Sequence, residues 1–184
     1  MRIMFSTPPM EGLLGPLLPL MEAATRGGHQ VVAATGGDLE KRVAATGASM
    51  RAVGRPPIES AMQAFGIAPT LLEVPEEWRF GAALFGHVIA PLQAEALRAL
   101  TADWRPDLIV HPPVDIAAPL IAAELGVPSV TCGTGGVPPA DLLEALEAAV
   151  APLWQEAAMA QPAFCGLFQH RYLDIFPTSI QHDR

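Results

Sequence analysis

The chain has 184 residues, 51% hydrophobic and 16% charged, which excludes intrinsic disorder and is enough for one domain with a sizeable core. Its 11 basic and 19 acidic residues give a formal net charge of −8, which disfavours binding to nucleic acid or to an anionic membrane surface. Two cysteines are too few for a disulfide framework, so we expect a reducing, cytoplasmic location.

Strands and helices alternate through the first third of the chain. Apolar runs predict strands at 2–6, 29–34 and 48–53, with helices between them at 16–26 and 38–46. Pro16 suits the first turn of one helix, and Asp38 is expected to cap the other. This β-α-β-α-β order predicts a parallel sheet with right-handed crossovers.

The alternation is interrupted once and then resumes. Residues 54–78 predict a long, partly helical insertion, and a longer helix bent at Pro91 is expected over 80–102. The remaining elements are strands at 107–111, 128–132 and 172–176 and helices at 116–125 and 142–160. The fold class is therefore α/β, with a Rossmann-like doubly wound parallel sheet flanked by helices. Residues 1–176 are expected to form a single lobe, followed by a tail or linker at 177–184.

Several common site motifs do not occur in the sequence. The turn after the first strand has Gly12 and Gly15 but no G-x-G-x-x-G, and there is no phosphate-binding Gly-Lys-Ser/Thr and no G-x-S-x-G. The histidines form no H-x-x-x-H or H-x-H pair, so no metal site is expected. The uncharged runs fall short of the ~18 residues that a membrane span needs.

Ligands of doubly wound sheets bind beyond the carboxyl ends of the strands, so candidate site residues are sought there. His111 ends the fourth predicted strand, where it either touches a ligand or completes the core. Asp115 caps the following helix, acts in a site, or does both. Trp78 and Phe80 follow the insertion and either line an apolar cleft or pack in the core.

Six stretches in the same order resemble the N-terminal, acceptor-binding lobe of bacterial natural-product glycosyltransferases of family 1, the macrolide and enediyne type with the two-lobed GT-B fold. They include Arg2-Ile3-Met4-Phe5-Ser6, Gly15-Pro16-Leu17-Leu18-Pro19-Leu20 and Trp104-Arg105-Pro106-Asp107-Leu108. The others are 27–36, 125–128 and 172–179, so the resemblance covers nearly the whole chain.

The resemblance implies transfer of a sugar from a nucleotide-sugar donor to an apolar acceptor in secondary metabolism, such as antibiotic biosynthesis. The first lobe binds the acceptor and the second lobe binds the donor, with no metal, and no cofactor is expected on this chain. Asp115 would orient a histidine base. The acceptor site would comprise Met10, Glu11, Gly12, Leu13, Trp78, Phe80, His111, Asp115 and Gly135.

Two departures qualify this expectation. Leu13 occupies the position of the family's histidine base, and leucine cannot accept a proton. The sequence also ends where the first lobe ends, so this chain, whether a fragment or a native single lobe, is expected to be inactive alone. The alternative is a non-catalytic binding or partner module, and a third reading is an unrelated flavodoxin-like or hydrolase domain. A face that meets a second lobe would be exposed here and would favour self-association.

Overall fold

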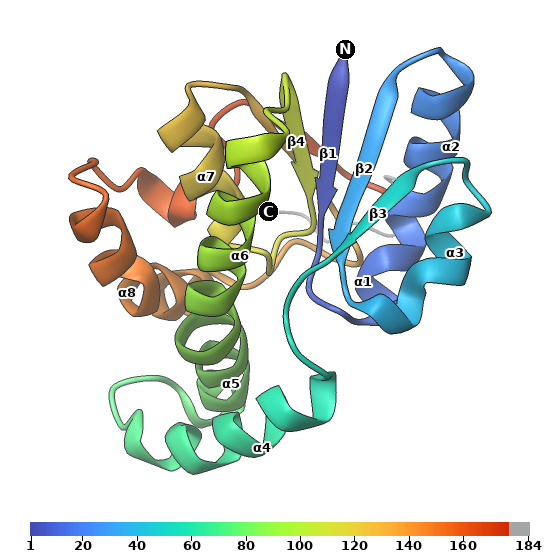
Figure 1. Ribbon diagram of the computed structural model, residues 1–184. Helices are drawn as coiled ribbons and strands as arrows, with labels where there is room; N and C mark the ends of the chain where they lie inside the picture. Colours follow the sequence, from blue (N-terminus) through green and yellow to red (C-terminus); the bar gives the residue numbers. More distant parts are fainter. Residues whose placement is uncertain (177–184) are drawn as a thin grey trace.

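The computed structural model describes residues 1–176 as a six-stranded parallel sheet with helices on both faces (Figure 1). The strand order is β3-β2-β1-β4-β5-β6, which is the order of the Rossmann fold. The predicted doubly wound sheet is therefore confirmed. The strands are β1 (Arg2–Ser6), β2 (Gln30–Thr35), β3 (Ser49–Ala52), β4 (Leu108–His111), β5 (Ser129–Cys132) and β6 (Arg171–Leu173).

The two faces of the sheet carry separate cores because successive strand residues point to opposite sides. Ile3 and Phe5 of β1 belong to one cluster, which also contains Leu17 and Met21 of the following helices. Met4 lies on the other face, in a cluster formed with the helices that flank β4. The apolar strands without clean alternation are thus explained by helices on both sides.

The first helical segment begins earlier than predicted. The chain forms α1 (Glu11–Leu14), a 3-10 turn (Gly15–Leu17) and α2 (Leu18–Arg26), whereas the sequence predicted a start at Pro16. The Met10 carbonyl accepts hydrogen bonds from the backbone N–H groups of Leu13 and Leu14, so a helical turn forms before Pro16 is reached.

The predicted capping role of Asp38 is wrong. The second helical segment consists of a 3-10 turn (Gly37–Leu39) and α3 (Glu40–Ala44), and its first cap is Gly36, without a side-chain hydrogen bond. Gly47 ends the segment in the left-handed conformation, with φ of 78°.

The insertion is largely helical, with α4 (Pro57–Ile67), a 3-10 turn (Ala68–Thr70) and α5 (Glu76–Gly81). From α5 the chain continues as a π-helical segment η4 (Ala82–Ile89) and as α6 (Ala90–Asp103). The sequence predicted a bend at Pro91. Because Pro91 has no N–H group for an α-helical hydrogen bond, the turns before it widen, and the Ala90 N–H bonds to the Phe85 carbonyl, five residues back.

The helical run over Glu76–Asp103 is long and apolar enough, by length and composition, to cross a membrane. In this structure 56% of its most apolar window is buried inside the protein. That burial is typical of a helix in the core of a folded domain.

The remaining helices are α7 (Ala117–Leu125), α8 (Ala140–Glu156) and a 3-10 segment (Ala163–Gly166). The predicted helix 142–160 is therefore shifted toward the N-terminus, and the predicted strand 172–176 is the shorter β6. After Leu173, the Asp174 side chain accepts a hydrogen bond from the Phe176 N–H, and this turn ends the strand. The predicted tail at 177–184 lies outside the described residues.

Candidate functional site

The sheet changes winding direction between β1 and β4, which are neighbours although they are far apart in sequence. Ligands of such folds bind beyond the carboxyl ends of the strands at this point. Figure 1 shows α4 and α5 on the same side, beyond the ends of the strands. The candidate site therefore comprises the loops that follow β1, β2, β3 and β4.

The buried Pro9, beyond the end of β1, lies close to the loops that follow β2 and β3. A Cβ atom on Gly36 would overlap its ring, and one on Gly54 would lie 3.5 Å from Pro9 Cδ. Gly36 follows β2, and Gly54, with φ of 78°, follows β3. Glycine is therefore needed at position 36 because Pro9 lies so close, and at position 54 because the backbone is left-handed there, since a Cβ on Gly54 would make only an ordinary contact with Pro9.

A buried polar network joins β1, α6 and the start of α7. The Ser6 hydroxyl donates to Oδ2 of Asp115 at 2.5 Å, and Nε2 of Gln93 donates to Ser6 Oγ at 3.0 Å. The Ala118 N–H donates to the other Asp115 oxygen at 3.3 Å, so Asp115 does cap the helix as predicted. Burial raises the pKa of Asp115 to about 6, against the opposing effect of its hydrogen bonds.

Asp115 is 2% exposed, and both of its carboxylate oxygens are bonded within the protein. It anchors the carboxyl end of the sheet and presents no open surface to a ligand in this structure. Sequence reasoning missed Gln93. The signal was present, because Gln93 is a polar residue among the apolar positions of the helix predicted over 80–102.

His111 is fully buried at the end of β4. Its Nδ1 lies 3.0 Å from the carbonyl oxygen of Pro112, and its Nε2 lies 3.4 Å from the hydroxyl of Thr131, which itself donates to the Leu167 carbonyl. Burial lowers the pKa of His111 to about 4, so the ring is neutral at pH 7. The structure places it in the core, which was one of the two roles that the sequence left open.

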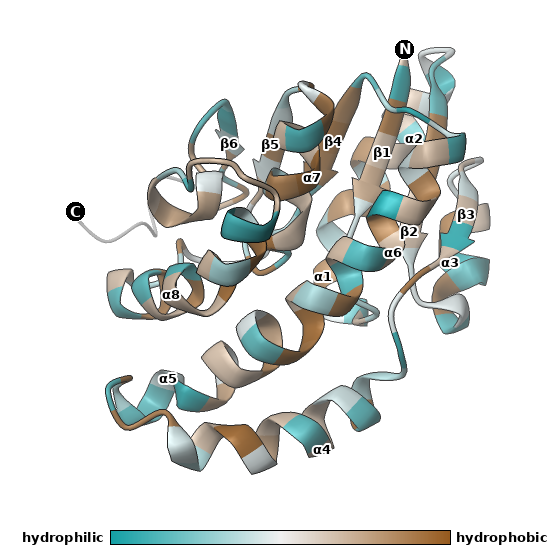
Figure 2. Ribbon diagram, turned by 60° about the vertical axis from the view of Figure 1, so that its left-hand side comes forward, coloured by the Kyte–Doolittle hydropathy of each residue, from teal (hydrophilic) through white to brown (hydrophobic). Residues whose placement is uncertain are grey.

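Three of the predicted site residues meet in one apolar cluster. Met10, Trp78 and Phe80 pack against the buried side chains of the insertion and η4, and the rings of Phe65 and Phe80 lie 4.6 Å apart. Figure 2 shows hydrophobic stretches along α4 and along the helix that joins α5 to α6. The insertion thus brings aromatic side chains to the β1–α1 turn, although it is remote in sequence.

The remaining predicted residues of the acceptor site are exposed or half-buried and do not belong to this cluster. Leu13 is half-buried on α1, and Gly12 and Gly135 have open space where a side chain would project. Glu11 is exposed and forms an ion pair of 2.7 Å with Arg42 of α3. Within residues 1–176, no group of three or more His, Cys, Asp or Glu side chains is placed to hold a metal ion.

The family model described as "Erythromycin biosynthesis protein CIII-like, N-terminal domain" matches residues 80–182, which is more than half of the chain. The chain belongs to this family. The EryCIII-like domain is homologous to the N-terminal lobe of natural-product glycosyltransferases, and its sheet corresponds to one lobe of the GT-B fold.

Relatives of this EryCIII-like domain are about twice its length. The L-demethylnoviosyl transferase of Streptomyces niveus is 34% identical over 193 residues, covering 98% of this chain and 46% of that protein. SnogD from Streptomyces nogalater is 26% identical, with a TM-score of 0.67, over 97% of this chain and 45% of that one. The chain therefore spans about half the length of the relatives it matches.

Other solved structures share the fold. The glycosyltransferase SsfS6 from Streptomyces sp. SF2575 superposes with a TM-score of 0.77 at 22% identity, over 99% of this chain and 52% of that one. SsfS6 has also been solved with thymidine diphosphate. The spinosyn rhamnosyltransferase SpnG, solved with the spinosyn aglycone, superposes with a TM-score of 0.60 at 18% identity, over 86% of this chain and 42% of that one.

Proposed function

We propose that this chain is the acceptor-binding lobe of a glycosyltransferase that transfers a sugar from a nucleotide-sugar donor to an apolar natural product. Membership of the EryCIII-like N-terminal domain family carries this proposal. The apolar cluster of Met10, Trp78 and Phe80 supports it, because drug-sized ligands bind against hydrophobic and aromatic side chains. The chain would bind the acceptor and, without a donor-binding lobe, would transfer no sugar.

The proposed acceptor position lies over Met10, Glu11, Gly12 and Leu13, with Trp78, Phe80 and Gly135 around it. Asp115 and His111 would then support the acceptor position without touching the acceptor, because both are buried in this structure. Asp115 would hold the end of β1 through Ser6 and so fix the turn that carries Leu13. We also propose a cytoplasmic location, consistent with two free, buried cysteines.

Thermal melting with two kinds of ligand tests acceptor binding. A panel of uncharged apolar aglycones, including the spinosyn aglycone, should contain at least one that raises the Tm by roughly 5–10 °C at about 100 times its Kd. Thymidine diphosphate should leave the Tm unchanged. A Tm increase with thymidine diphosphate and none with any aglycone would contradict the proposal.

One observation favours a second candidate function, a non-catalytic binding module. Leu13, at the position of the family's histidine base, has no group that can accept a proton. Its neighbour Glu11 is held by Arg42. The test is Leu13→His in a protein that joins this chain to a donor-binding lobe from a relative. Transfer gained by the variant supports a disabled enzyme, and unchanged inactivity supports the binding module.

Self-association of the isolated lobe is part of the proposal. Ile58, Met62 and Phe65 are each more than 60% exposed and lie four and three residues apart, so they share one face of α4. An apolar stripe of this kind favours association between copies. Sedimentation equilibrium should show a concentration-dependent mass for the wild type and a monomer for Met62→Glu. A monomeric wild type at high concentration would contradict it.

A further inference from the structure

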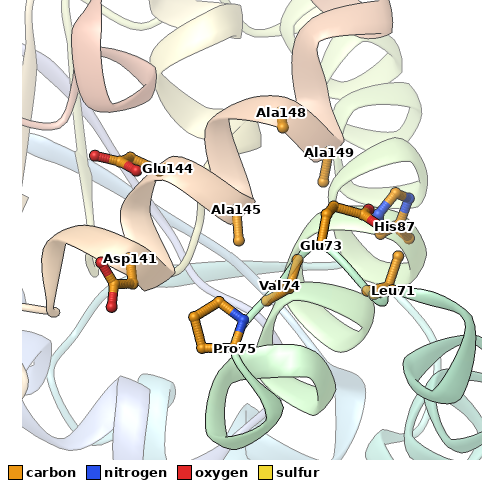
Figure 3. A pocket seen from close by; sticks show the side chains of 10 residues that line it. All are labelled: Leu71, Glu73, Val74, Pro75, His87, Asp141, Glu144, Ala145, Ala148 and Ala149. Carbon is orange, nitrogen blue, oxygen red and sulfur yellow. The ribbon is translucent and has the colours of Figure 1, made fainter.

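A groove of about 500 Å³ lies between the end of the insertion, η4 and α8 (Figure 3). The segment 71–75 forms one wall, α8 forms the other, and His87 of η4 lies at one end. The volume is in the range of small-molecule sites. None of the nine residues predicted for the acceptor site lines this groove.

Small side chains on α8 leave the space open. η4 and α8 pack so closely that a Cβ atom on Gly86 would lie 2.5 Å from Cβ of Ala149. Ala145, Ala148 and Ala149 follow one another along the groove wall, where longer side chains would fill it. Together with the buried Leu71 and Val74, they give the groove an apolar floor.

The rim of the groove is acidic. Glu73 comes from the segment before α5, and Asp141 and Glu144 come from the first turns of α8. All three are exposed, and none forms an ion pair with a basic side chain in the described part of the chain. The guanidinium of the nearby Arg79 donates to the carbonyl oxygens of Val74 and Leu72, and in the described structure it forms no ion pair with these carboxylates.

We propose that this groove binds a small apolar molecule that carries a protonated amine. The apolar floor takes the hydrocarbon part, and the three carboxylates favour a cation over a neutral or anionic ligand of the same shape. An organic cation fits better than a metal ion, since the described residues hold no set of three metal-ligating side chains. None of the residues proposed for the acceptor position lines this groove, although Leu71 and Val74 of its floor belong to the same apolar cluster as Met10, Trp78 and Phe80.

The test uses three probes of one shape and different charge, namely 1-aminoadamantane, 1-adamantanol and 1-adamantanecarboxylate. Isothermal titration calorimetry at low salt should give the amine a Kd about fivefold lower than that of the alcohol, because exposed carboxylates contribute little each. The carboxylate should bind more weakly than the alcohol. The preference for the amine should shrink as salt is raised.

Two variants and two matched controls locate the site. Ala148→Leu fills the groove from an exposed position and should weaken amine binding at least about tenfold. Glu144→Gln removes one rim charge and should weaken it about twofold. Ala44→Leu and Glu40→Gln change exposed residues of α3, outside the groove, and should leave the Kd unchanged.

Equal affinity for the amine and the carboxylate, unchanged binding in Ala148→Leu, or no binding of the amine at about 1 mM would each overturn the proposal. The outcome is separable from that of acceptor binding. Ala148→Leu should leave the thermal shift caused by an aglycone unchanged, because Ala148 does not belong to the cluster around Met10. Failure of either proposal therefore does not decide the other.

Discussion

We expect Asp115→Asn and His111→Asn to change the pH dependence of the free energy of unfolding in opposite directions. Both residues are buried at the carboxyl end of β4: His111 is the last residue of the strand, and Asp115 follows it in the loop before α7. Burial raises the pKa of Asp115 from 3.8 to about 6 and lowers that of His111 from 6.5 to about 4. The two groups thus titrate over nearly the same pH range with opposite signs.

The signs follow from proton binding in the folded and unfolded states. Between about pH 4 and 6 the folded protein holds a proton on Asp115 that the unfolded chain has lost, so this residue lowers stability as pH rises. Between about pH 4 and 6.5 the unfolded chain protonates His111 while the folded protein does not, so this residue lowers stability as pH falls. In the wild type the two contributions largely cancel.

The magnitude is measurable. Integrated between about pH 4.5 and 7.5, each pKa difference corresponds to about 2 kcal/mol. Asp115→Asn should therefore gain about 2 kcal/mol relative to the wild type as pH rises over this range, and His111→Asn should lose a similar amount. Lost hydrogen bonds and packing add a constant to each variant and cancel in the comparison between the two pH values.

The assay is urea unfolding of the three proteins at both pH values, with stability taken from the midpoint and slope. Groups shared by all three proteins cancel when each variant is subtracted from the wild type. Differences of the same sign for the two variants, or a difference below about 0.5 kcal/mol for either, would refute the assigned burial and its electrostatic cost.

Two further predictions concern packing and thiol chemistry. Gly86→Ala should destabilise the protein by about 1–3 kcal/mol, because the new Cβ atom would overlap Ala149. Gly66→Ala should be neutral or stabilise the protein by up to about 1 kcal/mol, because there is open space at this position of α4. Urea unfolding measures the stability of both variants. Burial raises the pKa of Cys132 above its usual range and that of Cys165 to about 12, so iodoacetamide at neutral pH should label neither before unfolding and both in urea. Rapid labelling of the native protein would count against their burial.

The strands could be predicted from the sequence because their signal is local. Runs such as Arg2–Ser6 are short, apolar and bounded by proline or glycine, and the structure has β1 at that range. The alternation of strands and helices then restricted the topology to a doubly wound sheet. The helix boundaries that were predicted wrongly depended on individual hydrogen bonds, such as the two that the Met10 carbonyl accepts at the start of α1.

The site was less predictable because its geometry depends on residues that are far apart in sequence. Asp115 was selected for its position after β4, but the Ser6 hydroxyl that donates to it lies 109 positions away in the sequence, and only the fold shows that Ser6 and Gln93 form one buried network with it. The meeting of Met10 with Phe80 likewise required the path of the insertion. Burial, which determines the charge states of His111 and Asp115, is a property of the packed chain.

The insertion also has a core of its own. Ala64, Leu71 and Val74 are buried against Ala82 and Ala83 of η4, in a cluster that contains no residue of the sheet. Local unfolding free energies follow such separate clusters. Amide hydrogens of α4 are therefore expected to exchange through a local opening that leaves β1 and β4 intact, and Met10, Trp78 and Phe80 of the proposed acceptor position would belong to the unit that opens first.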